Sequence, residues 1–155
     1  RLVYTGKYNL TDELPEVPLN VGKLVLSPTR TYAPVVVEVF KNMRSKINGM
    51  IHCSGGAQTK VLHFIDNVHI IKDNLLPTPP LFGLIQEQSG TDWKEMYKVF
   101  NMGHRMEIYL NEKYADVVID IAKHFNVEAQ IIGRVEASDK KQVTITSAHG
   151  NFVYA

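Results

Sequence analysis

The sequence has very little of what crosslinks a chain or binds a transition metal. Cys53 is the single cysteine in 155 residues, so an internal disulfide is excluded. There is also no tight cluster of cysteine and histidine of the kind that supplies thiolate ligands to zinc. We therefore expect no metal ligands in this chain and a reducing compartment, for which the cytoplasm fits best.

An excess of charge of one sign is also absent. The chain carries 17 lysines and arginines against 16 aspartates and glutamates, a net charge of +1. Proteins that bind nucleic acid or anionic membranes usually carry a broad basic surface. No apolar run approaches the length of about 18 residues that a spanning helix needs. We expect neither nucleic acid nor membrane as a partner. Any anion must be bound by a few local groups and not by a broad basic surface.

The length fits one domain, because a chain of this size buries about two-thirds of its unfolded surface. Arg1 is followed directly by the strand-like residues 2–5, so we expect the sequence to begin inside a longer chain or at a processing point. Glycines and prolines among charged residues break any periodicity in residues 6–22. The expected organisation is a linker or connecting arm over residues 1–22, leading from a partner domain, and one domain over residues 23–155.

Hydrophobic periodicity predicts alternating helices and strands. The predicted helices are 32–46, 57–66 and 112–125, with short helical segments near 81–85 and 92–99. The predicted strands are 49–53, 68–71, 106–110, 129–135 and 143–146. The last two should form an antiparallel hairpin around the polar turn at 138–141. This order favours an α+β fold in which the helices pack on one mixed sheet, with a closing part similar to a ferredoxin-like half.

The segment from His52 to Lys60 is the strongest local signal for function. Two adjacent glycines, Gly55 and Gly56, separate a predicted strand from a predicted helix. Glycine lets the backbone turn tightly, and we expect the free amide groups of residues 55–58 to face and bind an anion. A turn with two glycines can equally be a plain connection, and His52 can equally be a histidine at the edge of the core.

Several segments resemble the C-terminal domain of one enzyme family, aminoimidazole ribonucleotide (AIR) synthetase, also called phosphoribosylformylglycinamidine cyclo-ligase. They span residues 22–136 in the family's order. They read Leu-Ser-Pro-Thr-Arg-Thr-Tyr at 26–32, His-Cys-Ser-Gly-Gly-Ala at 52–57, Glu-Met-Tyr-Lys-Val-Phe-Asn-Met-Gly at 95–103 and Ile-Gly-Arg-Val at 132–135. Spaced motifs of this length rarely coincide by chance.

This resemblance implies a ligase of de novo purine biosynthesis that forms a C–N bond. In the family, ATP activates the formyl amide oxygen of formylglycinamidine ribonucleotide, and ring closure gives aminoimidazole ribonucleotide, ADP and phosphate. A preceding domain of the same chain carries most of the ATP and Mg²⁺ site and the contacts of a homodimer. The chain would then be the substrate-side half of an active site, inactive alone, with its catalytic residues unassigned.

Carried over by position, the resemblance also implies a site for a phosphate group of the substrate. Its expected residues are His52, Ser54, Gly55 and Gly56, with Thr29, Arg30, Asn101 and Gly103 nearby. The sequence departs from the family where Ser54 replaces threonine, Ala57 replaces a third glycine, and His104 and Arg105 stand in place of an apolar residue and glycine. Ala57 would be strained if its position requires a positive φ.

Other interpretations remain open at this stage. The chain could belong to another ATP-using member of the superfamily, such as selenophosphate synthetase, a hydrogenase maturation protein or formylglycinamidine ribonucleotide synthetase, or it could be a ligand-binding module without catalysis. Arg30 could bind a phosphate or only brace its loop. Cys53 is expected to be a buried filler rather than a nucleophile, Arg105 an outward, solvated residue, and Trp93 and Tyr97 packing residues.

Overall fold

A computed structural model describes residues 6–15, 17–28 and 30–155, and it confirms the α+β fold. The α-helices are α1 (Val21–Val25), α2 (Ala33–Met43), α3 (Pro80–Ser89), α4 (Trp93–Val99) and α5 (Ala115–His124). The 3-10 helices are η1 (Arg44–Lys46), η2 (Ala57–His63) and η3 (Glu112–Tyr114). The strands are β1 (Ile47–His52), β2 (Val68–Lys72), β3 (Met106–Leu110), β4 (Gly133–Ala137), β5 (Gln142–Ser147) and β6 (Gly150–Tyr154).

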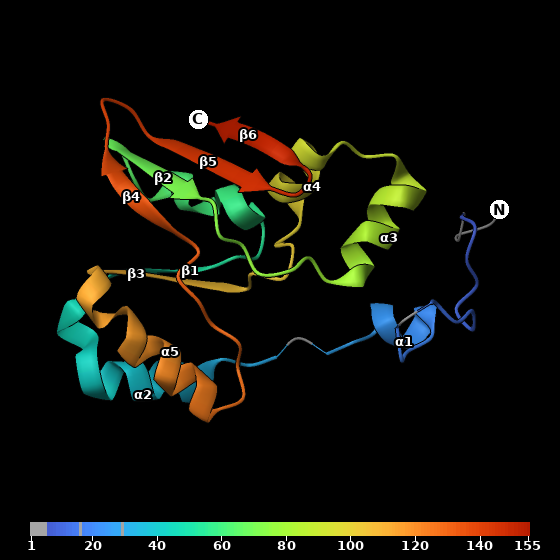
Figure 1. Cartoon of the computed structure of the whole chain (residues 1–155), viewed down its shortest axis with the longest axis horizontal. Helices are drawn as coiled ribbons and strands as arrows, with labels where there is room; N and C mark the ends of the chain where they lie inside the picture. The colour runs from blue at the N-terminus through green and yellow to red at the C-terminus, as the bar shows by residue number, and fades with distance from the viewer. Residues whose placement is uncertain (1–5, 16, 29) are drawn as a thin grey trace.

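The strands form two sheets rather than the single sheet that the sequence predicted. Strands β1 and β3 form an antiparallel pair, and the other sheet has the order β4-β2-β5-β6. That second sheet is mixed, because β2 runs parallel to β5 while the other neighbours are antiparallel. Figure 1 shows the β1–β3 pair lying between the four-stranded sheet and the helices α2 and α5.

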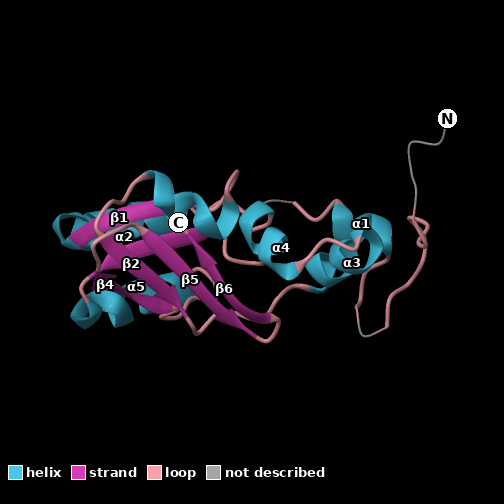
Figure 2. Ribbon diagram, turned by 90° about the horizontal axis from the view of Figure 1, so that it is seen from above, coloured by secondary structure: helices cyan, strands magenta, loops and turns pink. Residues whose placement is uncertain are grey.

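Helices α2 and α5 lie side by side beneath β1 and β3 (Figures 1 and 2). Val35, Val39 and Met43 recur every four residues on α2, so they share one face, and they pack with Ala122 of α5 in a small core. Pro34 stands in the first turn of α2, where its missing N–H costs nothing. The predicted helix 32–46 is confirmed as α2 followed by η1, and the predicted helix 112–125 as η3 followed by α5.

The larger core lies between the four-stranded sheet, η2 and α4. Ile70, Val143 and Ile145 supply the sheet side of this core, while Met96 and Tyr97 of α4 are almost completely buried against it. Trp93 is half-buried in the same cluster, so the prediction that Trp93 and Tyr97 are packing residues is confirmed. Figure 2 shows α3 and α1 extending beyond α4, away from both sheets.

Several predicted elements need correction. The segment 57–66 forms a 3-10 helix that ends at His63. The fourth strand begins at Gly133 instead of residue 129, and it pairs with β2, so β4 and β5 flank β2 and form no hairpin. The C-terminal hairpin is instead β5 with β6, a strand that the sequence analysis missed.

The connecting arm contains some regular structure. Glu13 forms an isolated bridge with Asn20, and the Asn20 side chain then caps α1 by accepting a hydrogen bond from the Lys23 amide at 2.9 Å. The expected boundary between residues 22 and 23 falls inside α1, and the division into arm and domain stays a prediction. No helix in the described residues has both the length and the apolar character needed to cross a membrane.

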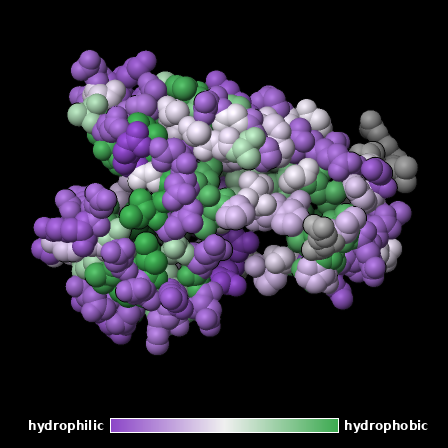
Figure 3. All heavy atoms as spheres, viewed as in Figure 1, coloured by the Kyte–Doolittle hydropathy of each residue, from purple (hydrophilic) through white to green (hydrophobic). Residues whose placement is uncertain are grey.

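The surface in the view of Figure 3 is largely hydrophilic, with one deep notch. The notch separates the lobe that contains β2 and β4 from the lobe that contains α2 and α5, and hydrophobic atoms gather along its floor (Figure 3). It corresponds to a cleft lined by β3, α5 and the extended segment 127–135.

Candidate functional site

The turn that follows β1 has the strained geometry that the sequence suggested. Gly56 has a φ of 83° and Ala57 a φ of 43°, both in the left-handed region. A non-glycine residue rarely adopts such a φ without compensation. The methyl group of Ala57 is buried, and its amide donates a hydrogen bond to the Ser54 carbonyl oxygen at 2.8 Å. The predicted strain at Ala57 is therefore confirmed, and local contacts hold the residue in place.

This geometry corrects the expectation that all the amides of residues 55–58 are available to an anion. The Ala57 amide is used inside the turn. The amides of Gly55 and Gly56 have no hydrogen-bond partner among the residues that the structure describes. Gly55 is exposed, and a Cβ placed on it would meet nothing within 4 Å. Gly55 is therefore an exposed residue whose amide has no described partner and whose lack of a side chain leaves room for a phosphate group to approach.

A lysine provides positive charge at this turn. Lys60 Nζ donates a hydrogen bond to the Ser54 hydroxyl oxygen at 2.6 Å. His52 and Ser54 are both exposed beside it. Lys60 ends the segment 52–60 but was not among the predicted site residues, although a lysine after a glycine turn is a common signal of phosphate binding.

Arg30 lies elsewhere in the fold. Its guanidinium donates to the carbonyl oxygen of Asn126 at 2.9 Å, so it joins the start of α2 to the end of α5. No hydrogen bond within the described residues connects it to the glycine turn. This contact supports the interpretation that Arg30 braces its loop, while a phosphate-binding role stays a prediction. Thr29 lies outside the described residues.

The turn at residues 101–103 contacts the segment that follows the glycine turn. Gln58, completely buried, donates from Nε2 to the carbonyl oxygen of Asn101 at 2.6 Å. The Asn101 side chain accepts from the Gly103 amide at 2.9 Å. Gly103 has a φ of 99°, and a Cβ there would come within 2.9 Å of Pro79. The structure therefore brings Asn101 and Gly103 to the segment that contains Gly55 and Gly56.

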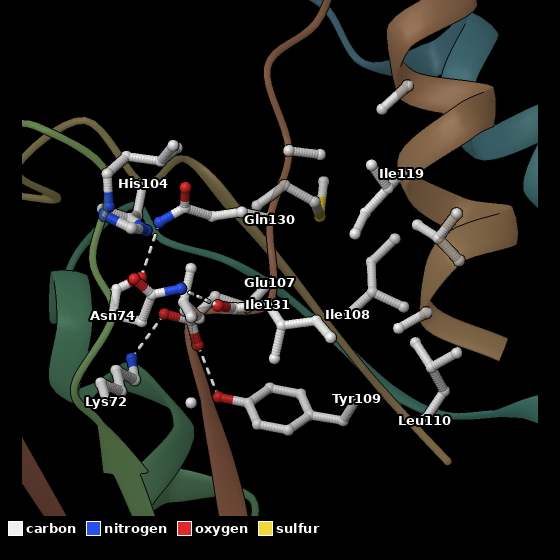
Figure 4. A pocket seen from close by; sticks show the side chains of 18 of the residues that line it. Lys72, Asn74, His104, Glu107, Ile108, Tyr109, Leu110, Ile119, Gln130 and Ile131 are labelled. Atoms are coloured by element: carbon white, nitrogen blue, oxygen red, sulfur yellow. Dashed lines mark hydrogen bonds and ion pairs between the residues drawn. The ribbon is translucent and has the colours of Figure 1, made fainter. Parts of the chain in front are cut away.

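A buried ion pair holds Gln58 from the other side. Lys72 Nζ donates to Glu107 at 2.5 Å and to the backbone and side-chain oxygens of Gln58 at 2.7 and 3.0 Å. The Tyr109 hydroxyl donates to the second carboxylate oxygen of Glu107 at 2.5 Å (Figure 4). Lys72 is only 1% exposed. Because β2 and β3 belong to different sheets, this network links the two sheets to the glycine turn.

Burial controls the chemistry of the groups around this network. Desolvation raises the pKa of the Cys53 thiol to about 12, so the thiol stays protonated at neutral pH. Burial and the nearby Glu107 carboxylate also raise the pKa of Tyr109. These directions support the prediction that Cys53 is a buried filler. No group of three or more metal-ligating side chains occurs in the described part of the chain.

The exposed part of this turn can bind an anion, because it presents backbone amides, a hydroxyl and one ammonium group. We call residues 52–60 with residues 101–103 the candidate phosphate site. The arrangement donates hydrogen bonds and supplies charge, which suits positioning of a phosphate ester. The outward, solvated position expected for Arg105 is only partly met, because Arg105 is half-buried.

Comparison with known proteins places this geometry in context. A family model described as "AIR synthase related protein, C-terminal domain" matches residues 10–146. The phosphoribosylformylglycinamidine cyclo-ligase of Methanopyrus kandleri is 35% identical over 137 residues, covering 88% of this chain and 38% of the relative. The cyclo-ligase of Syntrophus aciditrophicus is 30% identical over 150 residues, covering 91% of this chain and 41% of the relative.

A third relative, the cyclo-ligase of Methanocaldococcus jannaschii, is 34% identical over 130 residues, covering 84% of this chain and 37% of the relative. The chain therefore spans about two-fifths of the length of these curated relatives.

Proposed function

This chain belongs to the family of AIR synthase related proteins, as their C-terminal domain, and on that premise we propose that it is the substrate-side part of a phosphoribosylformylglycinamidine cyclo-ligase. The complete protein would use ATP to close formylglycinamidine ribonucleotide to aminoimidazole ribonucleotide, releasing ADP and phosphate. The relatives at 30–35% identity that carry this name support the proposal.

The proposal rests on the contact between segment 52–60, which contains the glycine turn, and the turn at residues 101–103. Through the hydrogen bond from Gln58 to Asn101, segments 43 residues apart in the sequence meet at one place. Gly55 and Lys60 belong to the same segment as Gln58, Gly55 is exposed, and the half-buried Lys60 donates to the Ser54 hydroxyl. We assign the substrate phosphate to these groups, with Ser54 and His52 beside it. Binding energy from a non-reacting phosphate can position the reacting part of a substrate.

We also propose that ATP and Mg²⁺ bind mainly to a preceding domain of the complete protein, and that this protein is a cytoplasmic homodimer. The support is that the relatives are much longer than this chain, which covers 37–41% of their length. Phosphoryl transfer requires positioning of metal and phosphates. The role assigned to this chain is to bind and orient the ribonucleotide on the opposite side of the active-site cleft.

The test is an assay of the complete protein that contains this chain. With ATP, Mg²⁺ and formylglycinamidine ribonucleotide, mass spectrometry should detect aminoimidazole ribonucleotide and ADP in equal amounts. Parallel assays should supply selenide with ATP, or formylglycinamide ribonucleotide with glutamine and ATP. Turnover in either of those assays, with none in the first, would assign the protein to another member of the superfamily.

A further inference from the structure

A second concave site adjoins the candidate phosphate site at Gly103 and extends away from the glycine turn. The cleft between β3, α5 and residues 127–135 has a volume of about 730 Å³, within the range of small-molecule pockets. In Figure 4 polar side chains lie on one side of this cleft and apolar ones on the other, with His104, Asn74 and Lys72 opposite Ile119, Ile108 and Leu110.

The apolar wall is not needed to complete either hydrophobic cluster. Ile108 and Leu110 of β3 and Ile119 of α5 are half-buried, and they do not contribute to the two clusters formed by the described residues. Ile131, which lines the same cleft, is 46% exposed. These side chains keep apolar surface in contact with water, and a ligand that covers it would gain free energy in proportion to the area buried.

The polar end presents one donor and two acceptors. The Leu76 amide donates to Nε2 of His104 at 3.0 Å, so the proton of the neutral ring is on Nδ1. Gln130 donates from Nε2 to the Asn74 carbonyl oxygen, and Asn74 donates from Nδ2 to the Ile131 carbonyl oxygen, both at 2.7 Å. The side-chain oxygens of Gln130 and Asn74 are then left to accept hydrogen bonds.

Charges at this end are largely neutralised by one another. Lys72 is paired with Glu107, and Asp73 is paired with Arg134 at 2.6 Å. The remaining charged lining residues, Arg105, Glu112 and Glu128, are of both signs and are exposed or half-buried. A charged ligand would lose its hydration and meet neighbouring charges of both signs, so the cleft favours an uncharged one.

We propose that this cleft binds a small uncharged molecule that has a flat apolar body and an amide-like end. The body lies against Ile119, Ile108 and Leu110. The carbonyl oxygen of the ligand accepts from His104 Nδ1, and its N–H group donates to the side-chain oxygen of Gln130. This site adjoins the candidate phosphate site at Gly103, and the proposal does not depend on the proposed function.

Benzamide is the probe, with benzoate and acetamide as matched controls. Added to the ¹⁵N-labelled chain, benzamide should shift the amide signals of Asn74, His104 and Ile119 with a Kd on the order of 1 mM. Benzoate adds a charge and acetamide lacks the ring, so each should bind at least about tenfold more weakly. Equal binding of all three, or no saturable shift up to the solubility limit of benzamide, would overturn the proposal.

Two variants locate the site. Ile119→Trp should fill the apolar side and abolish binding of benzamide. Gln130→Leu keeps the side-chain volume and removes the amide group. It should weaken the binding of benzamide by up to about tenfold and leave the binding of toluene, which has no amide, unchanged. Unchanged benzamide affinity in a folded Ile119→Trp variant would overturn the proposal, and so would unchanged affinity in Gln130→Leu if the tryptophan variant does not fold.

Discussion

Lys72 is the residue on which the geometry of the candidate phosphate site most depends. It is buried, it pairs with Glu107, and it holds both oxygens of Gln58. Nothing in the sequence links Lys72 to Glu107, because 35 residues separate them and each lies in a short strand whose other residues are mostly apolar. A buried charge pair of this kind becomes visible only when the two sheets are assembled.

Removing one member of this pair should be much more costly than removing both. In Lys72→Met the Glu107 carboxylate stays buried without its cation, which should cost about 3–5 kcal/mol of unfolding free energy. The double variant Lys72→Met with Glu107→Leu should recover most of that loss. Urea unfolding followed by circular dichroism measures both. A single variant that is as stable as the double variant would show that the pair is not buried as described.

His104 should make the stability of the chain depend on pH. Burial lowers its pKa below the ordinary value of 6.5, so the unfolded chain binds the proton at a higher pH than the folded chain does. The contribution of the neutral His104 ring to the free energy of unfolding is therefore complete above about pH 6.5. It is lost as the pH falls from there towards the pKa of His104 in the folded chain. Tm should therefore decrease between pH 7 and pH 5 more steeply than in His104→Gln. Parallel Tm profiles of the two proteins would refute this prediction.

At the scale of the elements, two glycines should respond oppositely to the same substitution. A Cβ on Gly133 would lie 1.9 Å from the Ile71 carbonyl oxygen, within the ladder between β2 and β4, whereas a Cβ on Gly83 of α3 meets nothing within 4 Å. Gly133→Ala should therefore cost more than about 2 kcal/mol, because the strands must separate. Gly83→Ala should stabilise by about 0.5–1 kcal/mol, since alanine is the better helix former.

Chemical denaturation of these two variants measures both effects. A stable Gly133→Ala protein would mean that β4 does not approach β2 this closely. A destabilised Gly83→Ala protein would mean that α3 is not helical at that position.

The sequence predicted best those helices in which apolar residues recur at helical spacing over several turns. Helices α2 and α5 follow from apolar residues every three or four positions, and their observed positions match the predicted ones closely. The β4 boundary was wrong because residues 129–132 are apolar at three of four positions but precede the residue at which pairing with β2 begins, Gly133. Strand β6 has a recognisable signal in the alternation of Phe152 and Tyr154 after the turn at 148–149, and this signal was overlooked.

The candidate phosphate site was predictable in part from the conformational preferences of its residues. Two adjacent glycines signal a tight turn, and the replacement at Ala57 correctly indicated strain. The interactions of the site with the rest of the fold were not predictable, because Gln58, Asn101 and Lys72 come from three separate elements or turns. Arg30 was grouped with the turn by resemblance alone, and its described contact is with Asn126.

At the scale of the whole molecule, we expect this chain to be inactive by itself. It spans about two-fifths of the length of its relatives, and catalysis of phosphoryl transfer depends on metal and phosphate positioning that we assign to a preceding domain. Incubation of the purified chain with ATP, Mg²⁺ and formylglycinamidine ribonucleotide should form no ADP above background. Steady ADP production that depends on the ribonucleotide would contradict this assignment.

The central claim is that the glycine turn binds the phosphate of the substrate. Gly55 is the best position for a test, because a side chain there enters open space, whereas Gly56 has a φ of 83° and any substitution would strain the backbone. The matched control is Gly83→Ala. Gly83 is far from the turn in sequence, and a side chain there also enters open space.

The measurement is calorimetric titration of the complete protein with formylglycinamidine ribonucleotide, before and after Gly55→Val. The account predicts a loss of at least about tenfold in affinity, equivalent to about 1.4 kcal/mol, with an unchanged Tm and normal binding by Gly83→Ala. Equal affinity of the wild-type protein and a folded Gly55→Val variant would contradict it and would show that the turn is only a connection between β1 and η2.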